Sequence, residues 1–293
     1  MTNSAAYAIE VRGLTKHYKD FTLGPLDLTV PSGSIVGLVG ENGAGKTTIL
    51  KAILRAIRPD GGQVAVLGGS CGERAVRARL GVVFEDAFFY ESCTPTEVGR
   101  ALARIQPGWD ADEYARLLRQ FELPPKKLIK DMSRGMRMKF RLAAALAHKP
   151  DLLILDEATS GLDPVVRGEV LELLQAHVLN ERHSVLLSSH ITADLEKTAD
   201  SIAYIHRGRL LFQMDKDALL EQYGILRCPA AQMDALPAGL VVFRRSGAFG
   251  SEALVNGANK VRRLLPNAVL DRASIDEIMQ FYTAKDKMGG DAQ

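Results

Sequence analysis

The sequence contains few cysteines, one tryptophan and no long hydrophobic run. Its three cysteines, Cys71, Cys93 and Cys228, lie far apart in a chain of 293 residues. Isolated cysteines in an odd number form neither a disulfide framework nor a zinc motif, and this usage is typical of a reducing compartment. The longest apolar run, from Leu142 to Ala147, is far shorter than the about 18 residues of a membrane-spanning helix. These absences argue against a secreted disulfide scaffold and against an integral membrane protein.

An excess of one charge sign is also missing. The chain has 37 Lys and Arg against 35 Asp and Glu, for a formal net charge of +2. This balance gives no electrostatic reason to expect a nucleic-acid partner. The first residues carry Glu10 and Arg12 and have no apolar signal core, so we expect a soluble, cytoplasmic chain. With 46% hydrophobic residues, the chain can form one large domain and a smaller one.

The most informative segment that is present is a glycine-rich loop of the form G-x-x-x-x-G-K-[ST]. It consists of Gly40, Glu41, Asn42, Gly43, Ala44, Gly45, Lys46, Thr47 and Thr48. An apolar run at 35–39 precedes it and a helix-like stretch at 47–57 follows, which is the strand–loop–helix context that the motif needs. The glycines allow backbone N–H groups to surround phosphate oxygens, and the helix adds its positive end. Lys46 is expected to reach the β- and γ-phosphates, and the Thr47 hydroxyl to bind Mg²⁺.

The hydrophobic pattern predicts an α/β fold. Alternating or continuous apolar segments indicate strands near 9–11, 21–30, 63–67, 80–84, 152–155 and 184–187. Three-to-four spacing indicates helices at 98–105, 110–121, 135–148 and 164–179. The short apolar strands are typical of a parallel sheet that is covered on both faces, and the helices between 94 and 149 form an inserted block.

Beyond residue 213 the pattern changes. A helix at 215–223, a strand at 240–243, a loop at 246–250 and a helix at 275–282 predict a small α+β appendage. We therefore expect a nucleotide-binding domain at 7–215 with a helical insertion at about 88–150, an accessory domain at 216–287 and a frayed tail at 288–293. The basic residues of this appendage indicate a solvated face, or else a surface for anionic lipid or a membrane subunit.

Two carboxylates follow the apolar run 152–155. Asp156 is placed to hold Mg²⁺, and Glu157 to polarise an attacking water as general base. By itself such a pair is more often a surface cap on a strand, but the phosphate loop favours the functional interpretation. His190 follows the next apolar strand, at the sheet edge where ligands bind in such folds, and is the expected γ-phosphate contact. A structural histidine is the alternative.

A second anion site is indicated at Ser133, Arg134 and Gly135, which open the helix that follows them. One chain does not need two such sites. The second is understandable if it binds the nucleotide of a partner chain.

Taken in order, these motifs resemble the nucleotide-binding subunit of ATP-binding cassette (ABC) transporters over residues 7–215. Residues 40–48 resemble the Walker A loop, 152–156 the Walker B strand, and 160–163, ending in Asp163, the D-loop. Glu157 is similar to the family's catalytic base and His190 to its switch histidine. Tyr18 lies where the family stacks an aromatic ring on adenine, although it could be an ordinary strand tyrosine.

The resemblance implies a P-loop NTPase core with a parallel sheet, an N-terminal antiparallel β subdomain, an inserted helical subdomain and a C-terminal appendage. It also implies ATP and Mg²⁺ as cofactors and a head-to-tail dimer, either of this chain or with a paralogous ATPase. The expected partner is a polytopic membrane subunit, with this chain peripheral on the inner face of the cell membrane. The segments Pro107-Gly108-Trp109-Asp110 and Tyr223-Gly224-Ile225-Leu226, with the departures described next, resemble the exporter branch of bacitracin, lantibiotic and acetoin-cluster transporters.

The sequence also departs from the family pattern. Glu85 stands where glutamine is usual, so an anion replaces a neutral amide at an expected metal ligand. The signature Leu-Ser-Gly-Gly-Gln reads Met132, Ser133, Arg134, Gly135, Met136, which keeps the two residues expected to touch a partner's γ-phosphate.

Other classes of ABC protein fit the sequence less well. A ribosome-acting protein would normally carry two cassettes, and a DNA-repair ATPase a long coiled coil. A soluble assembly scaffold, or a regulatory or immunity ATPase that drives no transport, remains the alternative.

Overall fold

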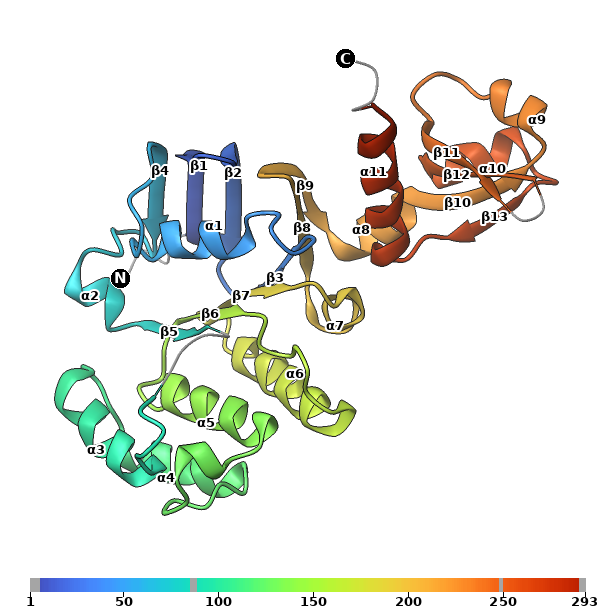
Figure 1. The fold of residues 1–293 in the computed structure, drawn as a ribbon. Coiled ribbons are helices and arrows are strands. Elements are labelled where there is room, and N and C mark those ends of the chain that lie inside the picture. Colours follow the sequence, from blue (N-terminus) through green and yellow to red (C-terminus); the bar gives the residue numbers. More distant parts are fainter. Residues whose placement is uncertain (1–5, 85–88, 248–249, 290–293) are drawn as a thin grey trace.

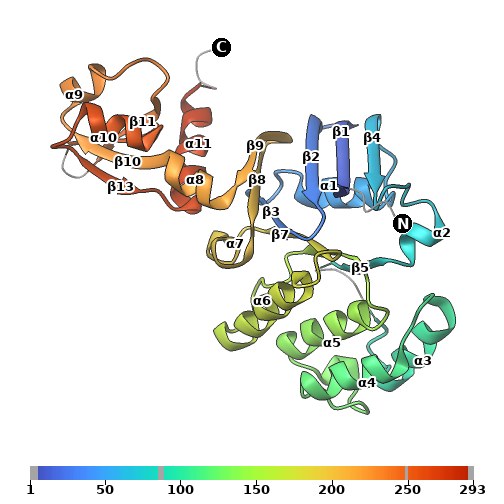
Figure 2. The ribbon, with the colours of Figure 1, turned by 180° about the vertical axis from the view of Figure 1, so that it is seen from behind.

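The computed structural model describes residues 6–84, 89–247 and 250–289, which form three β-sheets with helices packed on and between them (Figure 1 and, from behind, Figure 2). Within these residues, no helix combines the length and the apolarity that are needed to cross a bilayer.

The central sheet carries the motif residues. Its six strands lie in the order β5-β6-β7-β3-β8-β9; the first five are parallel and β9 is antiparallel to β8. Every residue of β3, β6 and β7 is buried, which explains the apolar runs at 35–39, 152–155 and 185–187 within them. The strands are β3 (Ile35–Val39), β5 (Leu80–Val83), β6 (Leu152–Asp156), β7 (Ser184–Ser189), β8 (Ser201–His206) and β9 (Arg209–Asp215).

A smaller antiparallel sheet lies beside the central one, in the order β2-β1-β4. It consists of β1 (Tyr7–His17), β2 (Thr22–Pro31) and β4 (Gly61–Val66). Helix α1 (Lys46–Ile53) packs against both sheets, because Ile49, Leu50 and Ile53 belong to the same hydrophobic core as Ile9 and Ile154. The remaining helices of this part are α2 (Arg74–Arg77), α6 (Pro164–Val178) and α7 (Thr192–Thr198).

The helical segment extends from the β5 edge of the central sheet (Figure 1). It comprises α3 (Pro95–Ile105), α4 (Ala111–Gln120), the short 3₁₀ turn η1 (Ile129–Asp131) and α5 (Arg134–Leu146). Side-chain caps fix where these helices begin: Thr94 forms a capping box with Glu97, and Asp110 and Ser133 cap α4 and α5.

The elements after Asp215 form an antiparallel sheet in the order β11-β12-β10-β13 with flanking helices. We refer to residues 216–289 as the accessory domain. It contains α8 (Lys216–Gln222), β10 (Tyr223–Cys228), α9 (Ala230–Asp234), β11 (Val241–Gly247), β12 (Gly250–Asn256), α10 (Ala258–Leu264), β13 (Val269–Arg272) and α11 (Ile275–Gly289). Both views show α11 standing between this sheet and the β8–β9 edge of the central sheet (Figures 1 and 2).

The fold class predicted from the sequence is confirmed, including the parallel core, the N-terminal antiparallel sheet and the inserted helices. Some local expectations differ. Strands β8 and β9 were not predicted, and the predicted loop 246–250 belongs mostly to β11 and β12. Helix α11 continues to Gly289 and so includes the first residues of the predicted tail.

Candidate functional site

The glycine-rich loop joins β3 to α1, and its glycines occupy positions that other residues could not. Gly43 and Gly45 have φ values of 80° and 112°, in the left-handed region that favours glycine. A Cβ on Gly40 would lie 2.4 Å from the carbonyl oxygen of Ile205. The loop therefore turns tightly against β8 and leads into the N-terminus of α1, a geometry suited to an anion.

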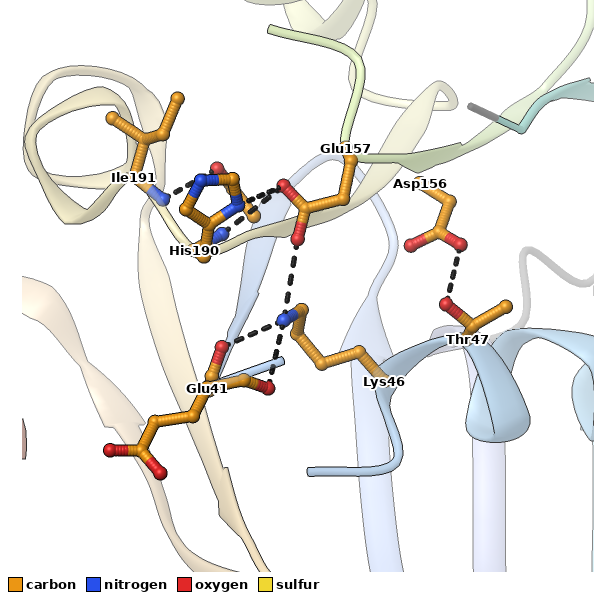
Figure 3. Close-up of polar contacts among 9 residues, drawn as sticks. Glu41, Lys46, Thr47, Asp156, Glu157, His190 and Ile191 are labelled. Atoms are coloured by element: carbon orange, nitrogen blue, oxygen red, sulfur yellow. Dashed lines mark hydrogen bonds and ion pairs between the residues drawn. The ribbon is translucent and has the colours of Figure 1, made fainter. Parts of the chain in front are cut away.

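Lys46 is buried, with 6% of its surface exposed, and its ammonium is held by three groups (Figure 3). Nζ donates hydrogen bonds to the carbonyl oxygens of Gly40 at 2.7 Å and Glu41 at 3.3 Å. It also lies 3.3 Å from Oε1 of Glu157, in an ion pair. A buried cation beside a loop that offers backbone N–H groups is the expected arrangement for phosphate oxygens.

The Thr47 hydroxyl donates a 2.8 Å hydrogen bond to Oδ2 of Asp156, at the end of β6 (Figure 3). Asp156 is 4% exposed, and its other oxygen, Oδ1, is buried without a hydrogen-bond partner among the residues that the structure describes. In the described residues there is no cluster of three or more His, Cys, Asp or Glu that could hold a metal. A hydroxyl and one carboxylate fit Mg²⁺, which takes few protein ligands and completes its shell with phosphates and water.

Glu157 connects this cluster to His190. Its Oε2 lies 2.7 Å from Nδ1 of His190 and accepts a longer hydrogen bond from the His190 backbone N–H at 3.3 Å. Glu157 has a φ of 53°, which is uncommon for a residue with a side chain, and its own N–H donates to the carbonyl of Ser188 on β7. Such backbone strain often marks a functional residue, because the surrounding structure has to hold it.

Lys46, Thr47, Asp156 and Glu157 line a cavity of about 530 Å³ between the glycine-rich loop and the end of β6. His190 does not line it and instead lines a neighbouring cavity with Gly40 and Glu41. Besides the predicted residues, the cavity is lined by Phe21, Lys51 and Phe84, which the sequence analysis missed. Tyr18 does not line the cavity; its ring is 47% exposed and lies 6.4 Å from that of Phe21. The sequence signal for Phe21 was a second aromatic residue three positions after Tyr18. In the structure the Tyr18 N–H donates to the Phe21 carbonyl oxygen, so both residues belong to one turn.

The other predicted nucleotide contacts lie away from this cavity. The Ser133 side chain is exposed and caps α5, and Asp163 caps α6 by accepting from the N–H groups of Val165 and Val166. Gly135 faces Val166, since a Cβ there would lie 3.3 Å from Cγ2 of that residue. The structure thus brings the starts of α5 and α6 together as a separate surface. Glu85 lies outside the described residues.

Comparisons with known proteins agree with this architecture. Residues 23–160 match the family described as ABC transporter. The bacitracin transport ATP-binding protein BcrA of Enterococcus faecalis is 34% identical over 214 residues, which cover 71% of this chain and 70% of the relative. The daunorubicin resistance ATP-binding protein DrrA3 of Streptomyces coeruleorubidus is 32% identical over 278 residues, covering 90% of this chain and 84% of the relative, so the similarity extends into the accessory domain.

A solved structure described as an ATP-binding subunit of an ABC transporter superposes with a TM-score of 0.64 at 31% identity, and covers 73% of this chain and 92% of that chain. The family resemblance read from the motifs is therefore confirmed. The chain belongs to the ATP-binding subunits of ABC transporters and is an ATP hydrolase of the P-loop type.

Proposed function

We propose that this chain binds Mg-ATP in the cavity behind residues 40–48 and hydrolyses it to drive a membrane transporter. The observation that carries the proposal is the position of Glu157, whose carboxylate contacts both Lys46 and His190 beside the Thr47–Asp156 pair. In this assignment Lys46 binds the β- and γ-phosphates, and Thr47 and Asp156 hold Mg²⁺, which neutralises charge on the phosphates when it is bound.

The proposed reaction uses Glu157 as general base. The oxygen of a water attacks the γ-phosphorus while its proton moves toward the Glu157 carboxylate, and the bond to the β–γ bridging oxygen breaks to give ADP and phosphate. His190 holds the carboxylate in place through its Nδ1 contact and is exposed enough, at 43%, to touch the γ-phosphate as well.

We further propose that two chains close over two ATP molecules head to tail. Ser133, Gly135 and Asp163 lie outside the cavity of their own chain, at the adjoining starts of α5 and α6. The Ser133 side chain is exposed at a helix N-terminus, where a partner's γ-phosphate would be attracted. A homodimer satisfies this arrangement, because the chain contains both halves of the site; a dimer with a paralogue is the other form.

The polytopic membrane subunit is proposed to dock at a groove between β5 and helices α3 and α5. This cavity of about 370 Å³ is lined largely by apolar side chains, among them Leu102, Trp109 and Val82. Gln106 Nε2 and His148 Nδ1 also belong to lining residues and are buried without a hydrogen-bond partner among the described atoms. Tyr90 and Ile105, next in sequence to the lining residues Phe89 and Gln106, are 84% and 72% exposed and extend the apolar surface beside the groove.

The groove is connected to the nucleotide cavity by one strand. Leu80, Val82 and Val83 of β5 line the groove, and the next residue, Phe84, lines the nucleotide cavity. We propose that β5 couples the two sites, because it is the element that joins them. We propose that the chain docks from the cytoplasmic side of the membrane, as an ATP-binding subunit of this family.

The relatives named for bacitracin transport and daunorubicin resistance support an exporter of peptide-like or drug-like molecules. A soluble ABC ATPase that acts as a scaffold or regulator is the competing function. The transporter function and the soluble function are distinguished by the partner protein that the chain binds.

The test is a pull-down of tagged Glu157→Gln protein from detergent-solubilised native membranes with Mg-ATP. Lys46→Ala protein, which should not bind ATP, is the matched control, together with Glu157→Gln without nucleotide. Stoichiometric recovery of a polytopic membrane protein would support the transporter function, and Trp109→Asp should abolish it. Recovery of only a soluble dimer, or of ribosomes or scaffold proteins, would refute the membrane assignment and leave the ATPase chemistry intact.

A further inference from the structure

Helix α11 of the accessory domain contacts the glycine-rich loop directly. The hydroxyl of Thr283 donates a 3.1 Å hydrogen bond to Oε1 of Glu41, the second residue of the loop. The two residues also line a second cavity, of about 580 Å³, on the accessory-domain side of the loop. No feature of the nucleotide chemistry requires a C-terminal helix at this position.

A second connection runs through the turn after β8. Asp286 of α11 lies 3.2 Å from Nε2 of His206 and forms an ion pair with Arg207. The next residue, Gly208, donates its N–H to the carbonyl oxygen of Ala44 at 2.9 Å. Helix α11 therefore reaches the loop at two points, at Glu41 and, through this turn, at Ala44.

The contact of α11 with the core is anchored by buried side chains. Ile278 and Phe281 of α11 and Tyr204 of β8 have no exposed surface. The Tyr204 hydroxyl points to the carbonyl oxygen of Met279, at 3.4 Å. Because β8 pairs with β3, which ends at the loop, this packing fixes the position of Thr283 relative to Glu41.

The direction of the Glu41 carboxylate matters for binding an anion. Glu41 lines both the nucleotide cavity and the second cavity, so its carboxylate can be directed toward either one. Figure 3 shows the carboxylate turned away from Lys46, while only the backbone carbonyl of Glu41 faces that lysine. A carboxylate turned toward bound triphosphate would repel it, and the repulsion would grow with phosphate charge.

We propose that Thr283 is a positioning residue that holds the Glu41 carboxylate on the accessory-domain side of the loop and so favours ATP binding. The accessory domain thereby contributes to nucleotide affinity without touching the nucleotide. This inference rests on the nucleotide site assigned under the proposed function.

The test compares Thr283→Val with Thr283→Ser in purified full-length protein by titration with ATP and with ADP. Valine keeps the shape and removes the hydroxyl, whereas serine keeps it. Thr283→Val should raise the Kd for ATP about threefold to tenfold, the range of one hydrogen bond to a partly exposed charged group. The rise in Kd should be smaller for ADP, which carries less negative charge than ATP. It should also shrink as salt is added, because salt screens the repulsion between the carboxylate and the phosphates. Thr283→Ser and Lys285→Ala, a change at an exposed position two residues away on α11, should bind like the unmodified chain.

A double-mutant cycle with Glu41→Gln decides whether the effect passes through the carboxylate. In the Glu41→Gln background, Thr283→Val should cause no further loss, since there is no charge left to direct. An equal loss in both backgrounds, or no loss from Thr283→Val alone, would overturn the proposal. If Thr283→Val does not fold, Glu41→Gln alone serves: it should bind ATP at least as tightly as the unmodified chain, and weaker binding would overturn the proposal. If the unmodified chain binds no ATP, the nucleotide site itself is wrong.

Discussion

The guanidinium Nε of Arg167 lies 2.5 Å from Oδ1 of Asp194, which joins α6 to α7 through a nearly buried ion pair. Helix α6 begins directly after Asp163, and α7 begins two residues after His190. The pair therefore connects the helix that follows the predicted partner-contacting segment with the helix that follows His190, the proposed switch histidine. Asp194 is 3% exposed at its side chain, so the carboxylate depends on this partner.

Replacing Asp194 by alanine should destabilise the fold, because it removes the ion pair that joins α6 to α7 and leaves the partly buried Arg167 guanidinium without this partner. We expect the free energy of unfolding to fall by about 2–4 kcal/mol, as measured by urea denaturation. The double variant Arg167→Met with Asp194→Leu, which removes both charges, should recover most of that loss. A double variant as unstable as Asp194→Ala would show that the charges themselves are needed.

Replacing Glu157 by glutamine should separate binding from hydrolysis. The amide keeps the shape of the side chain but accepts a proton poorly, so we expect ATP turnover to fall by about 10²-fold or more. ATP binding should persist and, with hydrolysis blocked, a nucleotide-dependent dimer should accumulate in light-scattering measurements. Turnover near that of the unmodified chain would show that Glu157 is not the base.

Phe21 and Tyr18 can be compared as candidates for the adenine contact. Because Phe21 lines the cavity, Phe21→Ala should weaken ATP binding about tenfold, the order of one lost base–aromatic stacking contact. Inorganic tripolyphosphate, which has no base, should bind unchanged. If Tyr18→Ala gives the larger loss, the ring predicted from the sequence moves onto the base when nucleotide binds.

The stability of the fold should depend on pH through His177. Burial, with a smaller contribution from His183 stacked on it, lowers the pKa of His177 from 6.5 to about 4. The folded state then stays neutral where the unfolded chain takes up a proton, so stability is full above pH 6.5 and falls toward pH 4. The expected loss is about 2 kcal/mol at pH 5 relative to pH 7.5.

The control for this dependence is His177→Gln, which cannot titrate. Its free energy of unfolding should change less between pH 7.5 and pH 5 than that of the unmodified chain. Equal slopes in the two proteins would mean that other groups cause the acid sensitivity.

The sequence by itself determined the fold class and indicated which residues to propose for the nucleotide site. The glycine-rich loop needs its residues at fixed spacing, and Asp156 and Glu157 end an apolar strand, so both could be recognised locally. The buried parallel strands could also be recognised locally, because burial on both faces of the sheet leaves a short apolar run in the sequence.

Only the tertiary structure decided how these groups meet. The contacts of Glu157 with Lys46 and His190 join segments far apart in the chain, and no local pattern encodes distances between them. The place of Phe21 in the cavity wall and the reach of Thr283 to Glu41 likewise depend on how separate sheets and helices pack. Spacing in a sequence fixes which face of an element a residue occupies, whereas packing fixes what that face touches.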